Sequence, residues 1–186
     1  MSLRPRVDRS RIELFLKTLG ERSRCPARLY LVGGTTLVFE SLREQTLDID
    51  IVIDIAPNDH GEMIRIIRDL KDSLAINVEE ASPADFIPLP KGYETRHKFI
   101  ARFGSLDVFH FDLYSVTLSK IERGRVQDME DVLTLLQAGQ IEWTQLRNCF
   151  EDILPRFGQE SLRQDPIEFQ DNFRALETLW RERSGG

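Results

Sequence analysis

Two aspartates separated by one residue, Asp48 and Asp50, are the strongest chemical signal in the 186-residue sequence. Residues two apart on a strand point to the same face, with backbone positions about 6.6 Å apart. Carboxylates so placed can hold two Mg²⁺ ions, or Mn²⁺ in their place, for phosphoryl or nucleotidyl transfer. The alternative is a solvent-facing strand that carries aspartates by chance. Asp54 adds a third acid to that face, and because unpaired like charges repel, we favour a cation site.

The segment Gly33-Gly34-Thr35-Thr36 is a second signal, since it separates a short apolar run from a helical pattern. At such a junction the free backbone N–H groups favour an anion, and the absent glycine side chains let a phosphate approach closely. Thr35 or Thr36 could cap the helix or contact that phosphate. A Gly-Gly pair alone often marks only a turn. Because the aspartates follow it, we interpret the two motifs as a phosphate site beside a metal site.

A sheet must position these side chains, and the hydrophobic patterns predict one. An apolar residue at every second position of 47–55, with aspartates at three of the four positions between, indicates a half-buried strand, and Gly104-Ser105 between two apolar runs is typical of a hairpin. The strands predicted from such patterns cover 29–32, 47–55, 76–78, 99–103 and 106–111. Apolar residues at three-to-four spacing predict helices that include 12–19, 35–42, 63–70, 113–121, 126–136, 143–154 and 166–180.

This order of elements predicts a mixed α/β fold followed by helices. We expect residues 1–112 to form the α/β core, beginning with a helix, and residues 113–186 to form a helical part packed on that core as one compact unit.

Composition limits the function. A net charge of -6 disfavours a protein that holds nucleic acid by a broad basic surface. The apolar runs are too short to span a membrane, and the first residues lack the apolar centre of a secretory signal. The two cysteines, Cys25 and Cys149, form no disulfide framework or metal pattern. We therefore expect a cytoplasmic protein with no membrane partner.

The motif order resembles a known superfamily. Leu31-Val32-Gly33-Gly34-Thr35-Thr36, followed after a spacer by Asp48-Ile49-Asp50, is similar to the signature of the DNA polymerase β-like nucleotidyltransferases. Arg43 and Thr46 ahead of the acids make it resemble the AbiEii/AbiGii-type toxin nucleotidyltransferases. That branch also has a lysine helix followed by a helix with paired acids, which Lys120-Ile121-Glu122-Arg123 and Asp128-Met129-Glu130-Asp131 resemble.

The resemblance implies a mixed sheet with helices on one face and an open metal face. It also implies a third acid on a neighbouring strand, for which Asp107 is our choice and Asp112 the alternative, since Asp112 precedes a helix and suits a helix cap. Asp48, Asp50 and Asp107 would then hold the metal. Lys120 would bind the triphosphate and Asp128 would act in catalysis.

The remaining site residues implied by the resemblance bind nucleotide, and they are Gly33, Gly34, Thr35, Thr36, Arg43, Thr46 and Lys120. The activity implied is Mg²⁺-dependent transfer of a nucleotide from an NTP to an acceptor. RNA, often tRNA, is one implied acceptor, and a neutralising antitoxin is an implied partner if the protein is a toxin. Two alternatives stay open: a non-catalytic partner protein that keeps the fold, or a transferase acting on a protein or a small molecule.

Overall fold

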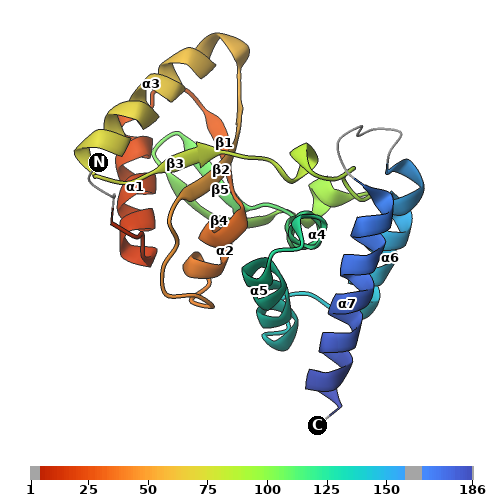
Figure 1. Ribbon diagram of the computed structural model, residues 1–186. Coiled ribbons are helices and arrows are strands. Elements are labelled where there is room, and N and C mark those ends of the chain that lie inside the picture. Colours follow the sequence, from red (N-terminus) through yellow and green to blue (C-terminus); the bar gives the residue numbers. More distant parts are fainter. Residues whose placement is uncertain (1–4, 158–164, 186) are drawn as a thin grey trace. The chain divides into compact units, whose positions relative to one another are not determined.

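The computed structural model describes residues 5–157 and 165–185. Five strands form one mixed sheet in the order β3-β2-β1-β5-β4 (Figure 1). Their bounds are β1 (Ala27–Leu31), β2 (Ile49–Ile55), β3 (Val78–Glu80), β4 (Lys98–Phe103) and β5 (Leu106–His110). The helices are α1 (Arg9–Arg22), α2 (Gly33–Phe39), α3 (Pro57–Ser73), α4 (Leu113–Arg123), α5 (Val126–Gln137), α6 (Trp143–Ile153) and α7 (Pro166–Ser184), with short 3₁₀ turns η1 (Pro83–Asp85), η2 (Tyr93–Arg96) and η3 (Leu154–Arg156).

The sheet combines parallel and antiparallel pairs around β1. β1 runs antiparallel to β2 and parallel to β5, β3 lies parallel to β2 at one edge, and β4 lies antiparallel to β5 at the other. The predicted mixed α/β fold is therefore confirmed. Among the described residues, none of the helices combines the length and the apolar character needed to cross a membrane.

One face of the sheet is buried under helices. Alternate residues of β1 and β2 turn toward α1 and α3, because side chains on a strand alternate between faces. The buried cluster on this face includes Phe15 and Leu16 of α1, Leu29 and Leu31 of β1, Ile49 and Ile51 of β2, and Met63 and Leu70 of α3. This core fixes the register of the strands that carry the acidic motif.

The opposite face of the sheet carries rows of side chains set by the strand register. A charged row crosses four strands at one end, and an aromatic and apolar row follows it. The charged row is Arg102, Asp107, Arg28 and Asp54, and the next row is Phe99, Phe109, Tyr30 and Val52. Asp50 lies beyond both, where Val32 N donates a 3.1 Å hydrogen bond to the Asp50 backbone oxygen.

The contacts within the chain divide it into two compact units. The first contains the residues up to Ser82 together with His97–Phe111, and the second contains Pro83–Arg96 together with the residues from Asp112 onward. The first unit holds the sheet with α1, α2 and α3. The second holds α4 to α7 and differs from the predicted helical part by including the segment Pro83–Arg96, which the sequence had placed in the α/β core.

Asp112 organises the start of the second unit. Its carboxylate accepts hydrogen bonds from the backbone N–H groups of Tyr114 and Ser115, so the predicted helix cap is confirmed. Arg96 donates to both carboxylate oxygens of Asp112 at 2.8 and 2.9 Å, which ties the segment containing η2 to α4. Bidentate guanidinium–carboxylate pairs of this kind are strong and directional.

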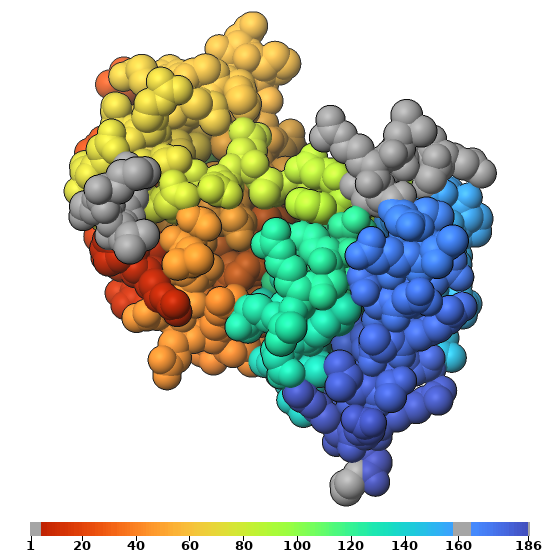
Figure 2. All heavy atoms as spheres, viewed as in Figure 1, coloured from red at the N-terminus to blue at the C-terminus, as the bar shows by residue number. Residues whose placement is uncertain are grey.

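Aromatic packing joins the last two long helices. Phe150 of α6 stacks on Phe173 of α7 with ring centroids 3.9 Å apart, and Trp143 stacks on the same ring. The other side of α7 faces solvent, and Figure 2 shows its atoms in blue on the viewed surface. The predicted helices at 113–121, 126–136, 143–154 and 166–180 are thus confirmed, each within a few residues of its expected end.

Candidate active site

Gly33 packs directly against the acidic motif. It has a positive φ of 59°, which favours glycine because other residues lack room for their Cβ. A Cβ at Gly33 would collide with the carboxylate oxygen Oδ2 of Asp50. The structure therefore brings the glycine turn and the acidic strand into contact, which the sequence motifs alone could only suggest.

Thr35 and Thr36 are buried and bonded to backbone atoms of the sheet. Thr35 Oγ1 accepts a 2.8 Å hydrogen bond from Asp50 N and donates to the Asp48 backbone oxygen at 3.4 Å, while Thr36 Oγ1 donates to Leu31 O at 3.1 Å. Neither side chain is exposed. The two hydroxyls therefore bond backbone atoms of β1 and of the segment around Asp50. This geometry does not favour the predicted contact of either hydroxyl with a phosphate.

Arg43 and Thr46 lie over Gly34. A Cβ built at Gly34 would be 2.8 Å from Thr46 Oγ1 and 3.4 Å from Arg43 Nη1. The backbone of Thr46 is anchored by a pair of hydrogen bonds with Val7, at 2.8 and 2.9 Å. A guanidinium beside a glycine turn can pair with a phosphate. The structure thus groups Gly33, Gly34, Arg43 and Thr46, four of the predicted nucleotide-binding residues.

Asp48 and Asp50 occupy the start of β2, where Asp48 immediately precedes the strand and Asp50 is its second residue. Both are partly exposed. The neighbouring strand β3 adds a third acid that was not predicted from the sequence. Glu79 of β3 is directly opposite Asp50 in the parallel register. Asn77 precedes β3, and its Nδ2 lies 2.6 Å from Asp48 Oδ1.

Glu79 was missed because β3 is only three residues long. Alternation cannot be read from so short a strand, and the turn signal Ser82-Pro83 marks only its end. The sequence feature that could have identified Glu79 is an acid next to an apolar residue, Val78, at the point where the chain returns from α3 to the sheet.

Oxygen donors are the ligands that Mg²⁺ prefers, and Asp48, Asp50 and Glu79 supply carboxylates on one face at one end of the sheet. Within residues 5–157 and 165–185, no group of three or more His, Cys, Asp or Glu side chains is arranged so that it could hold a metal ion. The three carboxylates have the donor chemistry that Mg²⁺ prefers, but their side chains do not form a metal site in this structure, and the amide nitrogen of Asn77 lies between Asp48 and Glu79.

Asp107 lies away from this group. In the register it is opposite Arg28 of β1, and Arg28 is four residues before Val32, which bonds to Asp50. Asp107 is therefore about 13 Å along the sheet from the level of Asp50. Arg102 donates to both Asp107 oxygens at 2.6 and 2.8 Å, and this hydrogen bonding lowers the pKa of Asp107. The structure does not bring Asp107 together with Asp48 and Asp50, because the strand register separates them.

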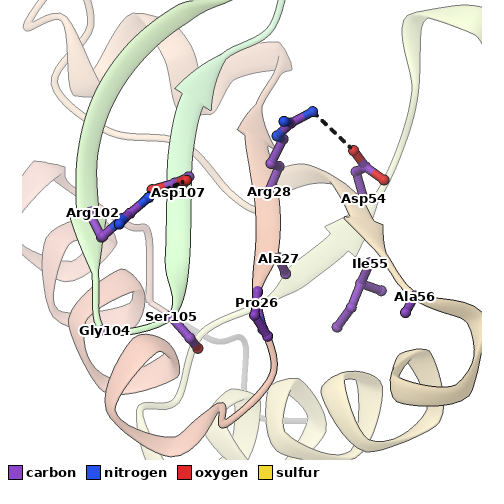
Figure 3. Close-up of a pocket in the computed structure, with 10 residues that line it drawn as sticks. All are labelled: Pro26, Ala27, Arg28, Asp54, Ile55, Ala56, Arg102, Gly104, Ser105 and Asp107. Carbon is purple, nitrogen blue, oxygen red and sulfur yellow. Dashed lines mark hydrogen bonds and ion pairs between the residues drawn. The ribbon is translucent and has the colours of Figure 1, made fainter.

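Asp107 instead lines a pocket of about 480 Å³ at the far end of the sheet (Figure 3). Arg28 and Asp54 form a second, looser pair there, with 3.9 Å between Nη1 and Oδ2. Opposite charges on neighbouring strands stabilise a sheet surface. The alternating row Arg102, Asp107, Arg28 and Asp54 is accounted for by these cross-strand pairs.

Lys120 and Asp128 meet inside the second unit. Lys120 is buried, and its Nζ lies 3.2 Å from Asp128 Oδ1 and 2.7 Å from Asp131 Oδ2. Arg123 donates to both oxygens of Asp128 at 3.1 and 2.7 Å. The paired acids of α5 are therefore joined to α4 by a buried ion network, and a contact of Lys120 with a triphosphate stays a prediction.

Comparison with protein families matches residues 10–175 to a family described as "Nucleotidyltransferase of unknown function (DUF6036)". No curated protein and no solved structure gives a significant match. The family match spans the glycine turn, the acidic strand, β3 and the ion network of α4 and α5. The chain belongs to this family of nucleotidyltransferases.

Proposed function

We propose that the protein is a metal-dependent enzyme that transfers a nucleotide from an NTP to an acceptor. The observation that carries the proposal is the contact of Gly33 with the Asp50 carboxylate, in a chain whose family is described as a nucleotidyltransferase. This contact supports the proposal because a glycine turn, whose backbone N–H groups suit a phosphate, adjoins a carboxylate that suits a divalent cation.

Asp48, Asp50 and Glu79 are the residues that would hold Mg²⁺ in this proposal, with Glu79 taking the place first given to Asp107. When bound, Mg²⁺ supplies charge neutralisation for the phosphates and lowers the pKa of an attacking hydroxyl. Thr35 keeps Asp48 and Asp50 in place through their backbone atoms. The carboxylates face the same side of the sheet because Asp48 and Asp50 are two residues apart and Glu79 is opposite Asp50 in the register.

The triphosphate would lie at Gly33 and Gly34, with Arg43 supplying positive charge. Thr46 supports this position through its backbone bonds with Val7. Lys120 and Asp128 belong to the second unit, and their participation in transfer is proposed only on the resemblance to the AbiEii/AbiGii-type enzymes.

RNA, and tRNA in particular, is the acceptor that this resemblance favours, and a toxin neutralised by an antitoxin is the biological role it suggests. Because the net charge of -6 disfavours binding through a broad basic surface, a contact with RNA would be local. A protein or a small molecule is the alternative acceptor. A non-catalytic protein with the same fold is the alternative to an enzyme.

Label transfer tests the proposal directly. Each of the four α-³²P NTPs is incubated with the protein, Mg²⁺ or Mn²⁺, and total RNA or co-purified protein. We expect label from an NTP in one acceptor class, loss of that label in Asp48→Asn and Asp50→Asn, and retention in Asp107→Asn. Equal labelling by wild type and Asp48→Asn would overturn the site. Absence of Mg²⁺-NTP binding in calorimetry would favour the non-catalytic alternative.

A further inference from the structure

Three aromatic side chains form a row on the face of the sheet opposite the core cluster, and they are Phe99 of β4, Phe109 of β5 and Tyr30 of β1. The ring centroids are 5.4 Å apart both between Phe99 and Phe109 and between Phe109 and Tyr30. All three residues belong to the first unit. Tyr30 is buried and Phe109 is half-buried, whereas 55% of Phe99 is exposed. This aromatic row therefore ends in a large apolar ring that faces solvent.

A β-bulge places Phe99 on this face. Phe99 is opposite Phe109, but the next paired residue of β4 is Ala101, so Ile100 is an extra residue in the strand. Ile100 packs against the core cluster on the other face. Residues three apart in a regular strand face opposite sides, yet here Phe99 and Arg102 face the same side. Bulges of this kind re-aim a side chain, often next to an active site. The bulge thus turns an exposed phenyl ring toward the side of the sheet that carries the other two rings.

The charged row beside the aromatic row presents more positive than negative groups to solvent. The exposed side-chain fraction is 69% for Arg102 and 62% for both Arg28 and Asp54, but only 26% for Asp107 (Figure 3). Arg102 donates two hydrogen bonds to Asp107, which fix the plane of its guanidinium. A guanidinium can pair with a phosphate or lie against a nucleobase. The charge next to Phe99 therefore complements a ligand that joins an aromatic ring to an anion.

The aromatic row lies on the same face of the sheet as the side chain of Asp50. Val52 continues the row on β2, and Asp50 is two residues before it, or about 6.6 Å along the strand. Phe99 is three strands away from β2, about 14 Å at the usual strand spacing. A single nucleotide with its α-phosphate at Asp50 cannot place its own base on Phe99, because only one ribose joins the base to that phosphate. A strand of several nucleotides that ends at Asp50 can reach it.

We propose that Phe99 and Phe109 form a platform on which an unpaired base of single-stranded RNA stacks, with Arg102 next to the phosphate of that nucleotide. The inference rests on the proposed function, because it takes RNA as the acceptor whose reacting end lies at Asp50. Aromatic side chains stack on every type of base and need no broad basic surface, which agrees with the net charge of -6. Paired bases are not available for stacking, so the platform selects single strands over duplexes.

Fluorescence anisotropy with a fluorescein-labelled oligoadenylate of about eight nucleotides, a usual length for a single-strand site, tests the platform. The titration is done in EDTA without NTP, so it does not require a bound cation. Phe99→Ala should weaken binding about 5- to 150-fold, the effect of losing one stacked base. Phe99→Leu keeps apolar surface but has no π face, so we expect most of the same loss. Phe99→Trp should bind at least as tightly as the wild type.

Leu14→Ala is the matched control, because Leu14 is also exposed, at 50%, but lies on α1, which covers the other face of the sheet. Its RNA affinity should equal that of the wild type. The unfolding temperature of each variant shows whether it is folded. In Arg102→Gln we expect the slope of log affinity against log salt to become shallower by about 0.7, because one phosphate contact is lost. AMP and a duplex RNA of the same length should bind more weakly than the single strand.

Wild-type RNA affinity in Phe99→Leu overturns the stacking platform, as does a wild-type protein that does not bind the oligoadenylate. Binding of AMP or duplex as tight as that of the single strand overturns the assignment to single-stranded RNA. Label transfer distinguishes these failures from failure of the proposed function. If label enters RNA and Phe99→Leu needs no more RNA than wild type for half-maximal transfer, the platform is wrong and the proposed function stands. If the oligoadenylate binds through Phe99 but no acceptor is labelled, the platform stands and the proposed function fails.

Discussion

The hydroxyl oxygen of Thr35 accepts a 2.8 Å hydrogen bond from the backbone N–H of Asp50. The same hydroxyl donates to the backbone oxygen of Asp48 at 3.4 Å, so one buried side chain of α2 bonds the backbone on both sides of Ile49. The glycine turn at the start of α2 and the two acids are therefore connected by hydrogen bonds as well as by packing.

Replacing Thr35 by valine keeps the shape of the side chain and removes its hydrogen bonds. The N–H of Asp50 then loses its acceptor, and we expect a loss of about 1–3 kcal/mol in the free energy of unfolding, together with weaker cation binding. Denaturant unfolding and Mn²⁺ calorimetry measure the two effects. Thr35→Ser retains the hydroxyl and should recover most of both. A valine variant with wild-type stability and Mn²⁺ affinity would contradict the role given to Thr35.

Gly33→Ala should damage the site more than the fold. A Cβ at this φ of 59° costs about 1–2 kcal/mol, and it would collide with the Asp50 carboxylate. We expect folded protein with lower stability and with Mn²⁺ binding reduced strongly, since Asp50 must move. Gly139→Ala is the matched control, because Gly139 also has a positive φ but a Cβ there meets nothing within 4 Å. Equal Mn²⁺ binding in both variants would contradict the contact.

Asp107→Asn tests the assignment of the third acid. Asp107 is paired with Arg102 at the far end of the sheet, so we expect this variant to keep wild-type label transfer. Glu79→Gln should lower transfer and raise the Mn²⁺ concentration required for half-maximal activity. A variant pair with the reverse pattern would return the metal site to Asp107.

Lys120→Met leaves two buried carboxylates without their shared cation. Breaking a buried ion pair by removing one partner typically destabilises by about 3–5 kcal/mol, and Lys120 is bonded to both Asp128 and Asp131. Denaturant unfolding measures the loss. Lys17→Met, a change of the same type in α1 outside this network, should leave stability near wild type. A similar stability of the two variants would rule out a structural role for the network.

His110 makes stability depend on pH. Burial lowers the pKa of His110, although Glu40 Oε1 at 2.6 Å from Nε2 opposes that shift and Lys98 adds to it. The unfolded chain therefore binds a proton more readily than the folded chain, and stability falls as pH decreases from about 7 toward 5. His110→Gln should make unfolding less sensitive to pH over this range. An unchanged pH dependence in the variant would assign the effect to other groups.

Hydrophobic periodicity predicted most of the fold because the long elements have clear patterns. Ile12 and Leu16 of α1, or Val132 and Leu136 of α5, recur at helical spacing and are buried. The hairpin at Gly104 followed from a residue that accepts a positive φ. The strand carrying Asp50 was expected from residue 47, but β2 begins at Ile49, and Leu47 is exposed.

The site was harder to predict because it depends on register. Asp107 has the expected type and an apolar setting, yet its pairing with Arg28 places it in a different row of the sheet from Asp50. Glu79 lies in the row of Asp50, on a strand too short for any pattern. Which residues face each other across strands is set by the packing of α1 and α3 on the sheet, and a single sequence carries no direct record of that choice.

The segment Pro83–Arg96 belongs to the second unit although its neighbours on both sides in the chain belong to the first. The polypeptide therefore passes from one unit to the other after Ser82, after Arg96 and after Phe111. Because each unit consists of two separate segments, cleaving the chain at one position cannot yield either unit with all of its residues. A fragment ending at Phe111 would keep Arg96 but lose Asp112, its partner in a buried bidentate pair. During synthesis, all five strands and the segment Pro83–Arg96 are made before helices α4 to α7. The second unit can therefore form only when these helices pack with a segment that was synthesised before them.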